Sequence, residues 1–200
     1  MKMSLQNLIL EKIEYKQLGA FTASDFLEFA RYDAVRKALD RLEDSNQIRR
    51  IIRGVYDRPR INRRFNMPEP PRIEDVAYAI ARQYNWYICP SGSFALNKLG
   101  LSTQVPARYV FVSNGPYVSY TIEGMRLIFK HTTSRETIRF SPITQLVIQA
   151  IKAIGRRNIS KDDVVYLRKS LNYKDKDILL DEGRRTSIWI YEIIKEICEV

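Results

Sequence analysis

The first third of the chain carries hydrophobic residues at helical spacing in three successive segments. The first apolar face consists of Leu5, Leu8, Ile9 and Ile13. Ser4 precedes this face and is a candidate N-cap. A shorter helical segment begins at the sequence TASDF, where Thr22 or Ser24 can act as the cap, and it ends near Ala30. The third apolar face consists of Val35, Ala38, Leu39 and Leu42, in a helix that starts around Tyr32 and stops at the polar sequence DSNQ.

Two β-prone segments follow the third helix and predict a hairpin. The sequences IRRII and VYD are separated by Arg53 and Gly54, and glycine supplies the positive φ that a tight two-residue turn requires. Helix, helix, helix and hairpin, in this order, is the topology of a winged helix-turn-helix. We therefore predict a winged helix-turn-helix DNA-binding domain over residues 1–66.

A proline-rich segment follows this predicted domain. The sequence NMPEPPR at residues 66–72 places three prolines in four positions. Proline lacks a backbone donor and restricts φ, so the segment is typical of a stiff, extended connector. We predict a linker at residues 67–72 and a second domain over residues 73–200.

The second predicted domain mixes helical and β-prone patterns. Its first apolar face consists of Ile73, Val76, Ala77, Ile80 and Ala81. The sequence PSGSFALNKLG predicts a short helix that Ser91 or Ser93 caps and Gly100 stops. The segments RYVFVS, YVSYTI and RLIFKH predict three strands, with turns at 114–116 and 123–124.

The remaining residues are predicted to be helical. PITQLVIQAIKAI has proline at its first turn, and Ser160 can cap a helix over 161–170. The tail from 185 to 198 carries a further apolar face of Ile190, Ile193, Ile194 and Ile197. We expect a small antiparallel sheet packed against helices, and the α+β class for the whole chain.

Composition and charge narrow the possible functions. Hydrophobic residues make up 45% and charged residues 28% of the chain, which is typical of a globular protein, and the net charge is +10. No apolar run approaches the roughly 18 residues that span a bilayer, and charged residues interrupt the N-terminal segment, so neither a membrane span nor a signal peptide is expected. The two cysteines, Cys89 and Cys198, lie far apart, which argues against a disulfide framework or zinc site and favours the cytoplasm.

The positive charge is concentrated in the predicted hairpin. Residues 48–64 contain seven arginines and one acidic residue, Asp57, for a local net charge of +6. So many cations beside one acid are not expected to be neutralised internally, and they predict contact with a nucleic acid. The third helix would enter the major groove, where Arg36 or Lys37 reaches guanine edges or phosphates and Tyr32 contacts a phosphate or a thymine methyl. The full set of predicted DNA-binding residues is Tyr32, Arg36, Lys37, Arg41, Arg49, Arg50, Arg53, Arg58 and Arg60.

The acidic residues of the third helix have a different expected role. Phosphates repel Asp33 and Asp40, so these side chains are expected to pair with Arg36, Lys37 or Arg41. Mixed charge on a helix is also typical of an ordinary solvated face.

Three stretches of the chain resemble the AbiEi-type antitoxins. They are FTASDF at 21–26, VRKALDRLEDSNQIRRIIRGVYDRP at 35–59 and PSGSFALNKLGLSTQVPARYVFVSNGP at 90–116. The resemblance covers both halves of the chain in the same order, and LGLSTQVP is its more specific part. It implies a type IV toxin–antitoxin system, in which an N-terminal winged helix binds inverted repeats in double-stranded DNA at its own promoter. The C-terminal antitoxin domain would counter a nucleotidyltransferase-like toxin without a stable complex. A solitary regulator with the same architecture is the alternative.

Enzymatic functions find little support in the sequence. The sequence SGS at 91–93 is similar to the start of a nucleotidyltransferase site, but that chemistry needs clustered carboxylates to hold magnesium, and no Asp or Glu occurs from Val76 to Ile122. The acidic pair 162–163 is assigned to a helix start and the pair 181–182 to a loop. We predict no catalytic residue, no metal site and no cofactor. His131 is interpreted as a surface or packing residue and Cys89 as a buried hydrophobe, and the aromatic side chains Tyr84, Trp86 and Tyr87 are assigned to the core.

A non-catalytic protein-interaction module is the alternative function. In that case the basic hairpin docks an acidic protein partner, and the winged helix is purely architectural.

Overall fold

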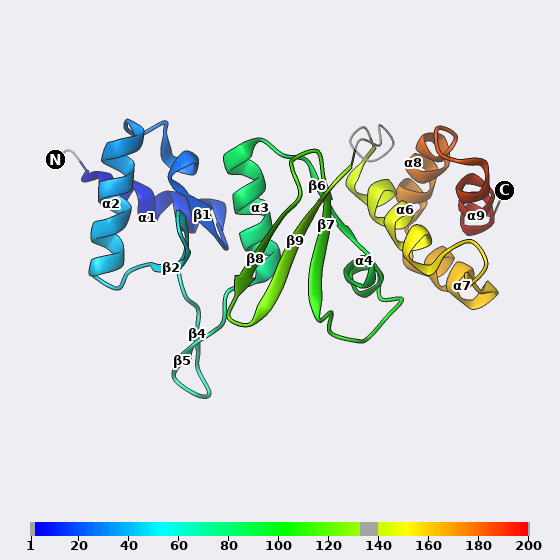
Figure 1. Cartoon of the computed structure of the whole chain (residues 1–200), viewed down its shortest axis with the longest axis horizontal. Coiled ribbons are helices and arrows are strands. Elements are labelled where there is room, and N and C mark those ends of the chain that lie inside the picture. The colour runs from blue at the N-terminus through cyan, green and yellow to red at the C-terminus, as the bar shows by residue number, and fades with distance from the viewer. Residues whose placement is uncertain (1–2, 133–139, 200) are drawn as a thin grey trace. The chain divides into compact units, whose positions relative to one another are not determined.

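Helices and short strands alternate along the chain and gather into two units (Figure 1). The computed structural model describes residues 3–132 and 140–199. The N-terminal unit contains the residues up to Trp86 together with Thr121–Met125, and the C-terminal unit contains Tyr87–Tyr120 and the residues from Arg126 onward. Both units contain helices and strands, which confirms the predicted α+β class.

The N-terminal unit begins with two helices and a three-stranded antiparallel sheet of order β1-β3-β2. A second, two-stranded ribbon and a further helix follow. The elements are α1 (Leu5–Lys16), β1 (Phe21–Thr22), the 3-10 helix η1 (Ala23–Phe26), α2 (Tyr32–Asp44), β2 (Arg49–Ile52), β3 (Val55–Asp57), β4 (Ile61–Asn62), β5 (Met67–Pro68) and α3 (Ile73–Tyr84).

The apolar faces predicted for the first and third helices form the core of this unit. Ser4 caps α1 by accepting the backbone N–H of Asn7 at 3.2 Å. The predicted face of α2 is confirmed, because its buried residues are the four expected ones. They pack against α1 and the aromatic rings of Phe21 and Phe26, which meet edge to face with centroids 5.6 Å apart.

The second predicted helix is only one turn of 3-10 helix. Thr22 is its N-cap, and the carboxylate of Asp25 accepts the backbone N–H of Thr22 at 2.9 Å. Short polar side chains that bond to the nearby backbone favour caps and turns over longer helices. The element therefore ends at Phe26 instead of Ala30.

The predicted hairpin is present. Ile52 pairs with Val55, which leaves Arg53 and Gly54 as the two turn residues, and Gly54 has a φ of +80°. β3 lies at the centre of the sheet, between β1 and β2. All three of its residues are buried.

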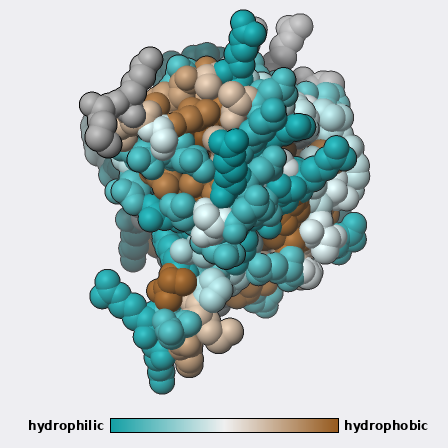
Figure 2. Space-filling model, turned by 90° about the vertical axis from the view of Figure 1, so that its left-hand side faces the viewer, coloured by the Kyte–Doolittle hydropathy of each residue, from teal (hydrophilic) through white to brown (hydrophobic). Residues whose placement is uncertain are grey.

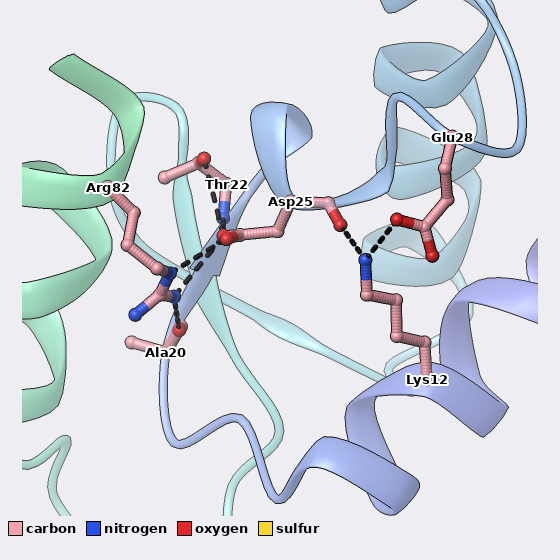
Figure 3. Close-up of polar contacts among 6 residues, drawn as sticks. All are labelled: Lys12, Ala20, Thr22, Asp25, Glu28 and Arg82. Atoms are coloured by element: carbon pink, nitrogen blue, oxygen red, sulfur yellow. Dashed lines mark hydrogen bonds and ion pairs between the residues drawn. The ribbon is translucent and has the colours of Figure 1, made fainter. Parts of the chain in front are cut away.

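The boundary between the units differs from the predicted one. It falls after Trp86 instead of at the proline-rich segment, because α3 packs against β1 and η1. Arg82 of α3 donates to the carboxylate of Asp25 at 2.8 Å and to the carbonyl of Ala20 at 2.9 Å. Figure 3 shows both contacts, together with Lys12 of α1, which donates to the carbonyl of Asp25 and to Glu28. The hydrogen bonds of Arg82 join α3 to η1, which contains Asp25, and to Ala20, which precedes β1.

The C-terminal unit contains a four-stranded sheet followed by a helical bundle. The sheet has the order β6-β7-β9-β8, in which β6 and β7 are antiparallel while β7 and β9 are parallel. The sheet is therefore mixed, whereas a purely antiparallel one was expected. The elements are β6 (Ile88–Ser91), α4 (Ser93–Lys98), β7 (Arg108–Ser113), β8 (Val118–Ile122), β9 (Met125–His131), α6 (Pro142–Ile154), α7 (Lys161–Ser170), α8 (Tyr173–Gly183) and α9 (Ile188–Cys198).

The strand β6 was missed, and the cap of α4 is not the expected serine. Gly92, with a φ of +62°, precedes α4, while the hydroxyl of Ser91 donates to the side-chain oxygen of Gln149 at 2.9 Å. The sequence NWYICPS contains a proline and continuous apolar residues without alternation, so periodicity does not separate a strand from a loop there.

The helical tail follows the prediction closely. Ser160 caps α7, and the buried residues of α9 are the four isoleucines of the predicted face. The acidic pair 181–182 lies within α8, not in a loop, and the carboxylate of Glu182 accepts the backbone N–H of Ser141 at the start of α6 at 3.0 Å. Burial is the largest single influence on the pKa of Glu182 and raises it. The hydrogen bonds from Ser141 and Thr144 together outweigh burial, so the pKa lies below its usual value.

Candidate nucleic-acid interface

A groove of about 450 Å³ in the N-terminal unit brings together several of the predicted DNA-binding residues. Its walls come from η1, α2, the β2–β3 hairpin and the end of α3. Four residues of the predicted set line it: Tyr32, Arg36, Arg50 and Arg53. Tyr32 and Arg53 are far apart in the sequence, and the packing of the hairpin against α2 brings them into one groove.

The outward surface of α2 carries two rows of side chains. Tyr32, Arg36 and Asp40 are spaced by four residues and line the groove. Lys37 and Arg41 form a neighbouring exposed row outside the groove. Within the described residues, none of the cations Arg36, Lys37 and Arg41 forms an ion pair with a carboxylate. Both rows therefore present uncompensated positive charge to solvent.

The expected pairing of Asp40 within α2 is wrong. Asp40 instead accepts a hydrogen bond from Arg50 of β2 at 2.9 Å, and Arg50 also reaches Glu43 at 2.6 Å. The guanidinium of Arg50 lies over the ring of Tyr56, 5.3 Å from its centroid. Arg50 thus holds the hairpin against α2, and its charge is largely neutralised by the two carboxylates.

Arg49 also has an internal partner. Its guanidinium donates to both carboxylate oxygens of Asp57, at 3.0 and 2.6 Å, and to the carbonyl of Glu69 at 3.1 Å. Asp57 is only 4% exposed, so the pair is structural. The hydrogen bond with Asp57 raises the pKa of Arg49, which keeps the guanidinium charged.

Arg58 and Arg60 lie away from the groove. Arg58 pairs with Glu14 of α1, and Arg60 is exposed near the carboxylate of Asp75. The expectation that the arginines of 48–64 lack internal partners is therefore wrong for Arg49, Arg50 and Arg58. Arg49 takes Asp57, the one acid within the segment, while the partners of Arg50 and Arg58 lie in helices outside the segment, where a local count of acids could not reveal them.

Arg53 is an exposed arginine without an ion-pair partner in the described residues, as the sequence predicted. It occupies the exposed turn of the hairpin beside Gly54, and both residues line the groove. It forms no ion pair within residues 3–132 and 140–199. Arg36 and Arg53 are therefore the two uncompensated cations of the groove.

The groove also contains residues that the sequence reasoning missed. Gln83 and Tyr84, at the end of α3, form part of its wall. Tyr84 is 53% exposed and stacks on Trp86 with a centroid distance of 4.9 Å, while Tyr87 is 60% exposed, so assigning these tyrosines to the core was wrong. Position 84 continues the apolar spacing of α3, but the helix ends there and Asn85 turns into the left-handed region with a φ of 54°. No feature of the sequence indicated this exposure.

The other reactive side chains have ordinary surroundings. Cys89 is buried, and burial raises the pKa of its thiol to about 12. His131 is exposed, and its Nδ1 bonds to the carbonyl of Gly115 at 2.8 Å, which requires a proton on Nδ1. Among the residues that the structure describes, no three His, Cys, Asp or Glu side chains meet in a way that could hold a metal ion. In the same part of the chain, no helix has the length and apolar character needed to cross a membrane.

The fold and the groove together define an α+β protein with a basic, aromatic surface on its N-terminal unit. Residues 8–179 match a family of unknown function, DUF6088, and the chain belongs to this family. No curated protein matches the chain. The match covers most of both units and ends within α8.

Proposed function

We propose that the chain is a DNA-binding antitoxin and transcriptional autorepressor of a type IV toxin–antitoxin operon. The observation that carries the DNA-binding part is the groove in which Tyr32, Arg36 and Arg53 meet. In this proposal, residues 1–66 act as a winged helix-turn-helix, with α2 as the recognition helix and the β2–β3 hairpin as the wing.

The geometry supports a division of labour within the interface. The recognition helix of a helix-turn-helix places its N-terminal residues nearest the base edges, and Tyr32 and Arg36 occupy the first two turns of α2. An arginine side chain can donate two hydrogen bonds to the same guanine, one to O6 and one to N7. Arg53, at the tip of the hairpin, is suited to a phosphate contact, and Lys37 and Arg41 can contact the backbone beside the groove.

The antitoxin part of the proposal rests on the resemblance of residues 21–26, 35–59 and 90–116 to the AbiEi-type antitoxins. In this proposal the C-terminal unit opposes a nucleotidyltransferase-like toxin without forming a stable complex, and the chain works in the cytoplasm. The target DNA is the chain's own promoter.

The DNA-binding part is tested by comparing two arginine variants on two duplexes. The first duplex is the one that the wild-type chain enriches from a randomised pool, and the second has a scrambled sequence. Arg36→Ala should weaken binding to the enriched duplex by about 1–3 kcal/mol, and by much less on the scrambled one. Arg157→Ala is the matched control, since Arg157 is exposed in the C-terminal unit. Equal losses on both duplexes would reduce Arg36 to a phosphate contact, and no binding by the wild type would refute the proposal.

The antitoxin part has a separate test. The gene next to the chain's own gene should be expressed alone and then together with the chain, while growth is measured. Growth arrest that the chain relieves, also with Arg36→Ala, is the expected result, because toxin neutralisation would not require DNA binding. If co-expression leaves the arrest unchanged, or the neighbouring product is harmless, the chain is a regulator without antitoxin activity.

A further inference from the structure

The strands β4 and β5 form a narrow ribbon where the sequence predicted the end of one domain and a linker. Ile61 pairs with Pro68, and Asn62 pairs with Met67. The base of the ribbon is closed by a hydrogen bond from the backbone N–H of Glu69 to the carbonyl of Arg60 at 2.7 Å. Arg49 of β2 donates to the carbonyl of Glu69 at 3.1 Å, which attaches the ribbon to the three-stranded sheet.

The tip of the ribbon is organised by its own hydrogen bonds. The side-chain oxygen of Asn62 accepts the backbone N–H groups of Arg64 at 3.0 Å and Phe65 at 3.4 Å. Asn66 adopts a left-handed conformation with a φ of 50°, which asparagine tolerates better than most residues. The residues of the ribbon do not belong to the core of the N-terminal unit. The ribbon is therefore a defined projection, which Figure 1 shows extending away from β2.

The ribbon exposes large apolar side chains that the rest of the fold does not use. Ile61, Phe65 and Met67 are 54%, 64% and 63% exposed. Figure 2 shows this projection at the lower edge of the view, with hydrophobic and hydrophilic surface side by side. Burying apolar surface contributes about 25 cal/mol per Å², so a cluster of this kind favours a bound partner.

The charge of the ribbon indicates the kind of partner. Arg60, Arg63 and Arg64 lie between Asp57 and Glu69, and no acidic residue occurs in that interval. The guanidinium of Arg64 lies 5.5 Å from the centroid of the Phe65 ring, so the tip combines a cation and an aromatic side chain. Proteins that contact the DNA minor groove combine arginines with an apolar wedge that enters between base pairs and kinks the duplex.

We infer that the β4–β5 ribbon is a second DNA-contacting element, whose tip inserts Phe65 into the minor groove while Arg63 and Arg64 contact the flanking phosphates. This inference rests on the proposed DNA-binding function and adds to it a contact outside the groove. The ribbon begins four residues after β3 ends, at the end of the hairpin opposite the Arg53–Gly54 turn, so its contact with DNA would be separate from that of the groove. The bound duplex is bent at the point of insertion.

The experiment measures the bend and the salt dependence of binding on the duplex enriched by the wild-type chain. Fluorophores at the two ends report the bend by energy transfer. The wild type should bend the duplex by an amount within the roughly 20–90° typical of such wedges. Phe65→Ala should abolish most of the bend and leave the salt dependence unchanged. The double variant Arg63→Ala, Arg64→Ala should reduce the slope of log K against log salt by about 1.8.

Tyr15→Ala is the matched control. Tyr15 is 80% exposed on α1 and has Lys16 over its ring at 5.3 Å, so it reproduces the exposed pair of cation and aromatic ring outside the ribbon. It should alter neither the bend nor the slope. Phe65 lies outside the core, and unchanged thermal unfolding of Phe65→Ala would show that the fold is intact.

The outcomes separate the ribbon from the groove. If the wild type binds DNA but Phe65→Ala bends it equally and the double variant keeps the full slope, the ribbon does not contact DNA and the inference fails. If Arg36→Ala loses sequence preference in the same experiments, the proposed function stands while the inference about the ribbon fails. If the wild type binds no duplex at all, both fail.

Discussion

Arg49 and Arg53 lie four residues apart in one hairpin and have opposite surroundings. Arg49 donates two hydrogen bonds to the buried carboxylate of Asp57, which neutralises its positive charge within the fold. Arg53 is exposed at the turn and forms no ion pair within the described residues. The local sequence does not distinguish the two positions. Their roles follow from the carboxylates that the sheet and helices bring near each side chain.

This contrast predicts opposite effects of two similar variants. Arg49→Ala should lower the free energy of unfolding by about 1–3 kcal/mol or more, because it leaves the buried carboxylate of Asp57 without a charged partner. Arg53→Ala should leave it nearly unchanged. Denaturant unfolding of both variants measures the difference. Equal stabilities would mean that the Arg49–Asp57 pair contributes nothing to the fold.

Asp75 predicts a pH dependence of stability. Burial, as the main cause, raises the pKa of this carboxyl, although nearby arginines oppose the effect. The folded state therefore binds the proton more tightly than the unfolded state, so stability falls as the pH rises from the unfolded pKa of about 4 through the folded pKa. Asp75→Asn removes the buried charge.

The expected result for Asp75→Asn is a higher melting temperature than that of the wild type at neutral pH. The advantage should shrink as the pH falls through the folded pKa, and it should be absent below the unfolded pKa of about 4, where the wild-type carboxyl is neutral in both states. Melting curves across this range provide the measurement. A variant that is less stable at neutral pH would show that the interactions of the ionised carboxylate outweigh its burial.

At the level of elements, α3 decides where the N-terminal unit ends. The sequence of α3 predicts its helical structure and its apolar face, but not the unit to which that face belongs. Arg82 attaches α3 to the N-terminal unit, because it donates hydrogen bonds to the carboxylate of Asp25 and the carbonyl of Ala20. α3 also brings Tyr84 to the wall of the groove.

The attachment of α3 can be tested through Arg82. The side chain of Asp25 is only 11% exposed, so Arg82→Ala should lower the free energy of unfolding by about 1–3 kcal/mol. Arg82→Lys should have an intermediate effect, because lysine keeps the charge without the planar fork that bonds both partners. Denaturant unfolding is again the measurement. If the alanine variant is as stable as the wild type, packing alone holds α3 to η1.

Much of the fold could be predicted from the sequence because helical faces repeat locally. The faces of α2, α3 and α9 and the Arg53–Gly54 turn were all predicted correctly. The strand β6 and the parallel pairing of β7 with β9 depend on contacts distant in sequence, which periodicity does not report. For the same reason the groove was predicted only in part. Tyr32, Arg36 and Arg53 were expected, while the exposure of Tyr84 and the pairing of Arg50 with Glu43 could not be read from local patterns.

At the scale of the whole molecule, the two units have different surfaces and different proposed roles. The N-terminal unit carries the groove and the ribbon, and so it holds the residues proposed to contact DNA. The C-terminal unit is built around a helical bundle with a core rich in isoleucine and leucine. The net charge of +10 favours association with a polyanion. Arg49, Arg50 and Arg58 form internal ion pairs, however, so a count of positive charges overestimates the number of residues available to contact DNA.

The central claim is that the groove binds DNA and that its uncompensated Arg53 contacts a phosphate, and the salt dependence of binding tests this contact most directly. The slope of log K against log salt should be measured for the wild type, Arg53→Ala and Arg58→Ala on the enriched duplex. We predict that Arg53→Ala reduces the magnitude of the slope by about 0.9, the value of one phosphate contact, while Arg58→Ala, whose charge is paired with Glu14, leaves it unchanged. An unchanged slope for Arg53→Ala, or equal reductions for both variants, would contradict the account.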